Sequence, residues 1–215
     1  SMRFYTEDKR LALLDIILHE AAHNFGPHSD TKIDGKRPGK IFGGPRASVL
    51  EELKAQTGAL YYLAKMQAWG LLEREDVHRV YNHALVWCFG HISRGMFTPD
   101  GKPKPYSHVA AIHVAHLARA GAMRWEADRL AANGEDQGCF VIDYDRVAGA
   151  VEQLMQRIGR IKATGDVQDA EALIATYVTG EAFALVHSEE IKERILRHPK
   201  ASFTYAVRIP PEKTR

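Results

Sequence analysis

The chain has 215 residues, of which 45% are hydrophobic and 26% are charged, and its formal net charge is +2. This length and composition are typical of a globular domain with its own core, and we expect a single domain over residues 1–215. The near-neutral charge argues against nucleic acid as a partner. Because no segment reaches the roughly 18 apolar residues of a bilayer span, we expect no membrane span. The sequence leaves the compartment open between cytoplasm and export.

The first predicted helix runs from about Thr6 to Asn24. Thr6 is a favourable N-cap, and the acidic residues that follow it suit the positive end of the helix dipole. Gly26-Pro27 ends the helix. Apolar residues at helical spacing predict one buried face, formed by Leu11, Leu14, Ile17 and Leu18.

A second helix is predicted from Ser48 to about Trp69, after a loop over residues 26–46 that is rich in Gly, Pro, Lys and Asp. The pattern Ser48-x-x-Glu51 is a capping box. In such a box Glu51 occupies the third helical position, where its carboxylate holds the start of the helix.

The sequence pattern predicts that the rest of the chain is mostly helical. Two extended runs, Met123–Ala127 and Cys139–Asp143, flank a turn-rich segment and predict a β-hairpin. The alternation within Ser202–Ile209 predicts one more short strand. Further helices are predicted at about 74–92, 106–120, 145–162, 167–176 and 188–197. We therefore expect a mainly α fold with a small β-hairpin.

The segment His19-Glu20-Ala21-Ala22-His23 is an HExxH motif. On a helix, residues four apart lie on one face, so both imidazoles can reach one metal ion, for which zinc is the usual choice. Glu20 lies beside them, where it can take a proton from a zinc-bound water. The alternative interpretation is a polar helix end with solvated histidines.

A catalytic zinc ion needs a third protein ligand and one open position. Glu51 and Glu52 are adjacent on the second helix, so their side chains point about 100° apart and are not expected to bind the same ion. Because Glu51 is assigned to the capping box, Glu52 is the predicted ligand. Without the HExxH motif, such an acidic pair would be interpreted as a partner of the helix dipole.

These residues resemble the catalytic half of the dipeptidyl peptidase III family of zinc exopeptidases. In that family an HExxGH or HExxH helix is followed by a helix with the motif E-E-C-R-A-E, and residues 51–56 here read E-E-L-K-A-Q. The segment Ile161–Val167 is similar to the family's K-S-T-G-D-V stretch, and His108–Gly121 resembles the family's helix before a hairpin. The resemblance implies a helical zincin-like catalytic domain.

The resemblance also implies the chemistry. One Zn2+ per chain would be held by His19, His23 and Glu52, with Glu51 supporting a ligand histidine, and dipeptides would be removed from the amino terminus of a peptide substrate. Glu20 would be the general base. The catalytic histidine of the family is matched most nearly by His108, and Tyr106 is an almost equal match.

The chain also departs from the family pattern. Gln56 stands where the family has a glutamate, so a contact next to the metal ligands changes from charged to neutral, which can cost 10–100-fold in affinity or activity. The family has a further lobe on the N-terminal side of the HExxH helix, and we expect that lobe to be absent here.

Two rival interpretations remain at this point. The first is a truncated or non-catalytic zinc-binding helical domain, and the second is a helical interaction domain without metal. His113 and His116, three residues apart and preceded by His108, allow a second metal site, although partly buried histidines are the simpler interpretation. Cys88 and Cys139 have no zinc-ribbon spacing.

Overall fold

The computed structural model describes residues 4–6 and 8–197. It confirms a mainly α fold with one two-stranded antiparallel sheet. The predicted strand at Ser202–Ile209 lies outside the described residues. The elements are α1 (Lys9–His23), α2 (Pro38–Ile41), α3 (Gly44–Ala68), α4 (Arg74–Ile92), α5 (Pro105–Arg119), β1 (Met123–Leu130), β2 (Gln137–Ile142), α6 (Tyr144–Thr164), α7 (Val167–Ile174), the π-helix η2 (Ala175–Thr179), the 3₁₀ helix η3 (Glu181–Val186) and α8 (Ser188–Arg197).

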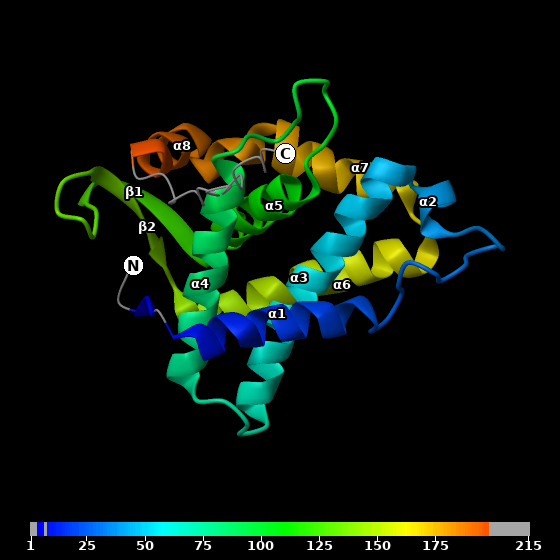
Figure 1. Cartoon of the computed structure of the whole chain (residues 1–215), viewed down its shortest axis with the longest axis horizontal. Coiled ribbons are helices and arrows are strands. Elements are labelled where there is room, and N and C mark those ends of the chain that lie inside the picture. Colours follow the sequence, from blue (N-terminus) through cyan, green and yellow to red (C-terminus); the bar gives the residue numbers. More distant parts are fainter. Residues whose placement is uncertain (1–3, 7, 198–215) are drawn as a thin grey trace, which may run out of the picture.

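Helix α3 is the central element of the fold, and it packs against α1, α5 and α6 (Figure 1). Every side chain from Leu53 to Leu60 is buried, including the polar Lys54, Gln56 and Thr57. A helix that is buried all round must carry apolar contacts on each face and must pair its polar groups inside the protein. The middle of α3 therefore contains three buried polar side chains that need hydrogen-bond or charged partners inside the protein.

Helix α1 lies across α3 and also touches α4 (Figure 1). It begins at Lys9, because the side chain of Asp8 accepts the backbone N–H of Arg10 and makes Asp8 the N-cap in place of the predicted Thr6. The predicted apolar face is correct in part. Leu11, Leu14 and Leu18 pack against the core, whereas Ile17 is exposed.

The start of α3 corrects the sequence prediction. The helix begins at Gly44, four residues before Ser48, and Gly43 caps it with a φ of 79°, a conformation that glycine adopts without strain. The predicted capping box is therefore wrong, because Ser48 lies inside the helix. The expected loop of residues 26–46 also contains the single helical turn α2. Glu51 is thereby free for another role.

Helices α1 and α3 meet most closely at Ala22 and Gly58. A Cβ atom built on Gly58 would lie 2.8 Å from the Cβ of Ala22, closer than two carbon atoms can pack. Ala22 belongs to the HExxH segment, and Gly58 lies six positions after Glu52. The missing side chain at position 58 thus lets the two helices that carry the candidate ligands approach each other.

Strands β1 and β2 pair antiparallel, with Met123 opposite Ile142 and Trp125 opposite Phe140. Both strands lie where the hairpin was predicted, and β1 continues further, to Leu130. Helix α8 reaches the hairpin through Arg194, which donates hydrogen bonds to backbone carbonyls of β2. Within the described part of the chain, no helix has both the length and the apolar character of a bilayer span.

The contact between α1 and α3 gives the first test. We expect Gly58→Ala to lower the free energy of unfolding by about 1 kcal/mol, since the overpacking cost exceeds the gain in helix propensity. Gly149→Ala on α6 is the matched control, because a Cβ there meets nothing within 4 Å and should add about 0.5–1 kcal/mol. Thermal or denaturant unfolding measures both. Equal stabilisation by the two substitutions would contradict this packing.

Candidate metal centre

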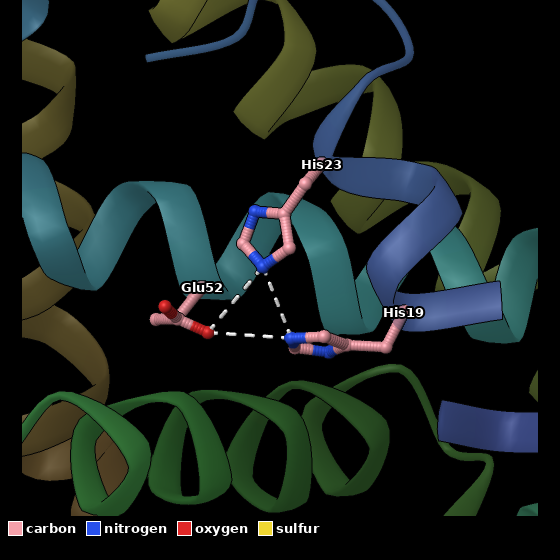
Figure 2. Close-up of side chains that lie close together, drawn as sticks. All are labelled: His19, His23 and Glu52. Atoms are coloured by element: carbon pink, nitrogen blue, oxygen red, sulfur yellow. Dashed lines mark hydrogen bonds and ion pairs between the residues drawn. The ribbon is translucent and has the colours of Figure 1, made fainter. Parts of the chain in front are cut away.

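Three side chains from two helices converge on one point. His19 and His23 come from α1 and Glu52 comes from α3, and Figure 2 shows the three pointing toward one another. The two Nε2 atoms are 3.2 Å apart, and Oε2 of Glu52 lies 3.3 Å from Nε2 of His19 and 3.8 Å from Nε2 of His23. Among the described residues this is the group of three whose ligand atoms lie close enough to share an ion.

The hydrogen bond of His23 fixes which of its ring nitrogens faces that point. Its Nδ1 is 2.9 Å from Oε1 of Glu51. Burial raises the pKa of Glu51, but the hydrogen bonds from Lys162 and His23 lower it more, so the carboxyl is ionised and can only accept. Nδ1 of His23 is therefore the donor, and in the neutral ring the lone pair of Nε2 points at His19 and Glu52.

The ring of His19 is also oriented by a hydrogen bond at its Nδ1, here with the amide of Gln56. Its Nδ1 is 2.9 Å from Oε1 of Gln56, while Nε2 of Gln56 donates to Oδ1 of the buried Asp15 at 3.2 Å. The Asp15 carboxylate thus fixes the orientation of the Gln56 amide. With the amide oxygen turned toward His19, Nδ1 of His19 donates and its Nε2 lone pair is directed to the same point.

Three electron-pair donors consequently face one another: two imidazole nitrogens and one carboxylate oxygen. Oε2 of Glu52 is buried and has no hydrogen-bond partner among the described residues. A buried carboxylate oxygen without a hydrogen bond is costly, and a cation would satisfy it together with both lone pairs. Two histidines and one glutamate, with an open side, are the donor set of catalytic zinc sites, so the residues present fit a zinc ion.

The charges in this group influence one another. Burial lowers the pKa of His19, but its contacts with Glu52 and Gln56 raise the pKa more, so the net change is upward. The same contact with His19 lowers the pKa of Glu52 more than burial raises it.

Glu20 and Tyr106 lie at the edge of the group. Glu20 is exposed on α1 and acts electrostatically on both His19 and Tyr106. Tyr106, in the first turn of α5, is 42% exposed, and its ring packs beside Trp87 and His91. Burial and the Glu52 carboxylate raise the pKa of Tyr106, which keeps its hydroxyl protonated. Its hydroxyl can therefore donate a hydrogen bond near the three candidate ligands.

His108 is placed differently from Tyr106. Its side chain is in the core, 3% exposed, and its ring meets the edge of Phe97 at a centroid distance of 5.1 Å. It lines a hollow together with Phe42, Val49 and Ile174, which contains none of the three candidate ligands. A catalytic role for His108 stays a sequence-based prediction, and of the two alternatives that the sequence left open, Tyr106 is the one beside Glu52.

The other histidines of α5 have structural partners. His113 is buried between the Thr57 hydroxyl at 3.0 Å and the Val109 carbonyl at 3.0 Å. His116 contacts the Tyr177 hydroxyl at 3.3 Å and the Ala150 carbonyl at 2.8 Å. Both residues are tied into the packing of α5, which agrees with the simpler interpretation of buried histidines.

Three residues next to the candidate ligands were not found from the sequence. Asp15 lies four positions before His19 and interrupts an apolar run, a spacing that could have identified it. Lys54 follows Glu51 by three positions, and the buried ammonium of Lys54 pairs with the partly buried Glu51 carboxylate on the same side of α3. Lys162 lies 111 residues away from Glu51, so only its place in the segment similar to K-S-T-G-D-V could have singled it out.

The comparisons with known proteins agree on the fold. No family model matches the chain. Dipeptidyl peptidase III from Caldithrix abyssi superposes with a TM-score of 0.67 at 19% identity, covering 89% of this chain and 33% of that one. Dipeptidyl-peptidase III from Corallococcus sp. strain EGB superposes with a TM-score of 0.69 at 21% identity, covering 91% of this chain and 32% of that one. The chain therefore has a dipeptidyl peptidase III-like fold.

A curated relative bears a different name. "Nudix hydrolase 3" of Arabidopsis thaliana is 29% identical over 165 residues, which are 76% of this chain and 19% of that protein. The chain thus spans about a fifth of that relative and about a third of the two solved structures. Because the match covers only 19% of that relative, its name does not describe the matched part alone.

The pairing of Gln56 with Asp15 explains why an amide stands where the resemblance expects a glutamate. A glutamate there would set its carboxylate against Asp15. We expect Gln56→Glu to destabilise the protein by about 1–3 kcal/mol, since it leaves a buried carboxylate facing another acceptor.

The second substitution Asp15→Asn restores a donor to the pair. The double variant Asp15→Asn/Gln56→Glu should therefore recover most of the lost stability, as measured by denaturant unfolding of the two single variants and the double. Additive losses in the double variant would show that the two side chains are not coupled.

Proposed function

We propose that this chain is the zinc-binding, catalytic part of a metallopeptidase of the dipeptidyl peptidase III type. The observation that carries the proposal is the convergence of His19, His23 and Glu52, with both Nε2 lone pairs and the buried Glu52 oxygen directed to one point. The dipeptidyl peptidase III-like fold supports it. A zinc ion bound there would supply Lewis-acid polarisation of a peptide carbonyl and a water of lowered pKa.

The residues around the site have separate roles in this proposal. Glu20 is the general base: its carboxylate is exposed and next in sequence to His19, and in this role it accepts a proton from water and delivers it to the leaving amine. Tyr106 donates its hydroxyl hydrogen toward the carbonyl oxygen of the peptide. Glu51 and Gln56 hold the two imidazoles in the orientation that presents Nε2.

Peptide substrates would approach along the exposed face of α1. Leu13, Ile16 and Ile17 are each more than half exposed, and with Glu20 they occupy one face of the helix by their spacing. Exposed apolar residues beside a reactive group are typical of a binding surface. We propose that this face forms one wall of a cleft whose other wall is a further lobe, as the resemblance implies.

The alternative is a zinc-binding domain that does not hydrolyse peptides in this form. The chain spans about a third of the two solved dipeptidyl peptidase III chains, so the activity of those whole proteins is a proposal for this chain. Metal binding and hydrolysis must therefore be measured separately.

Metal content of the purified protein is the first test. We expect about one zinc per chain by elemental analysis, because the donor set and its orientation suit zinc. His19→Ala and Glu52→Ala should lose most of the metal. His28→Ala is the control, since His28 is exposed in the loop after α1 and forms hydrogen bonds with Thr31 and Asp30 of that loop. Wild-type protein without zinc, even after zinc is supplied, would rule out a zinc peptidase.

Glu20→Gln separates binding from catalysis. It removes the proton acceptor but leaves the three candidate ligands, so zinc content should stay unchanged while peptide hydrolysis falls at least about 100-fold. Release of dipeptides from a peptide with a free amino terminus is the measurement, on this chain and on the longest natural form of the protein. Unchanged turnover in the variant would remove Glu20 from the mechanism.

A further inference from the structure

Two lysines are buried beside the candidate metal centre. The side chain of Lys54 on α3 is 0% exposed and that of Lys162 on α6 is 2% exposed. A buried ammonium group is stable only where it has charged or strongly polar partners. Both lysines meet the same partner, Glu51: Nζ of Lys54 is 3.2 Å from its Oε1, and Lys162 bonds to its Oε2.

The two lysines differ in what else they hold. Lys54 also donates to the backbone carbonyls of His23 at 2.9 Å and Phe25 at 3.2 Å, so it satisfies acceptors at the C-terminal end of α1. Among the described residues, Lys162 donates its hydrogen bond to Glu51. Replacing Lys162 therefore removes a partner of the Glu51 carboxylate without also removing hydrogen bonds to the end of α1.

The contacts form a continuous line through three helices. Lys162 of α6 bonds to Oε2 of Glu51 on α3, and Oε1 of Glu51 accepts from Nδ1 of His23 on α1. A carboxylate that is bound through both oxygens cannot rotate away from the imidazole. Its position then sets the position of the ring, and with it the direction of Nε2.

We propose that Lys162 is a positioning residue for the metal centre, which acts through Glu51 to hold the His23 ring with Nε2 directed at the metal position. The inference rests on the proposed function, because it assigns a role toward the same ion. It adds a contribution from α6 to a site whose three candidate ligands all come from α1 and α3.

The structure offers a matched control for this ion pair. Lys65 of α3 pairs with Glu152 of α6 at 3.5 Å, so it joins the same two helices by the same kind of contact. It is partly exposed, and neither residue is among those that surround the three candidate ligands. Loss of this pair changes the attachment of α3 to α6 without touching Glu51.

The experiment measures zinc affinity by competition with a chromophoric chelator. Lys162→Met should weaken binding about tenfold, at the lower end of the range known for residues that support metal ligands. Lys65→Met should leave it within about twofold. In a Glu51→Gln background, where the carboxylate is already gone, adding Lys162→Met should cost less than about threefold further. The melting temperature of each apo protein shows that the variants are folded.

A second measurement reads the ring of His23 without metal. Nitrogen-15 spectra of the apo protein, recorded where the ring is neutral and assigned with a His23→Gln variant, distinguish a proton on Nδ1 from one on Nε2. The wild type should show the Nδ1–H form. Lys162→Met should show a mixture of the two forms, and if that variant does not fold, Glu51→Gln reports on the same link.

The outcomes separate this inference from the proposed function. A wild-type protein that binds no zinc contradicts the function, while the ring spectra still decide whether Lys162 positions His23. Wild-type zinc affinity and an unchanged ring spectrum in folded Lys162→Met would overturn the inference. Equal losses from Lys162→Met with and without the Glu51 carboxylate would also overturn it, because Lys162 would then act by another route.

Discussion

The candidate metal centre depends on the close approach of α1 to α3. Two histidines on one helix can face an ion on their own, but the third ligand must come from a second helix at the right height and distance. Ala22 and Gly58 set that distance, because no side chain at position 58 separates the two helix backbones. The HExxH segment is thereby brought against α3, where Glu51 contacts His23 and both Glu52 and Gln56 contact His19.

The second constraint is the pairing of buried polar groups. Ionised and polar side chains inside a protein destabilise it unless each has a partner, and the partners here also fix geometry. Glu51 lies between two buried lysines and His23, and Gln56 lies between Asp15 and His19. Each imidazole thus donates its Nδ1 hydrogen to a different kind of acceptor, a carboxylate for His23 and an amide oxygen for His19. Among the described residues, Oε2 of Glu52 has no hydrogen bond and faces both rings.

Much of the fold could be predicted because its signals are local. The helical spacing of apolar residues gave the main helices to within a few residues, and the hairpin followed from its turn-rich centre. The start of α3 was missed, since Ser48-x-x-Glu51 matches a capping box that the glycine-proline start at Gly44 overrides. The prediction that the side chains of Glu51 and Glu52 point in different directions is nevertheless correct. Glu51 contacts His23 and the two buried lysines, whereas Glu52 faces the Nε2 atoms of both histidines.

The parts that sequence reasoning missed depend on distant contacts. Lys162 reaches Glu51 from 111 residues away, and no local pattern encodes that pairing. Two residues apart on a helix, Tyr106 and His108 differ by about 200° around the axis. If the alignment of this segment to the dipeptidyl peptidase III family shifts by two positions, it exchanges Tyr106, which lies beside Glu52, for His108, which lies in the core.

X-ray absorption at the zinc edge of the metal-loaded protein identifies the atoms that bind the ion. We expect two imidazole nitrogens and at least one carboxylate oxygen, at about 2.0–2.2 Å, with no sulfur. Sulfur scattering at about 2.3 Å, or an ion surrounded by water oxygens without imidazole, would contradict it, since the ion would then be bound elsewhere than at His19, His23 and Glu52.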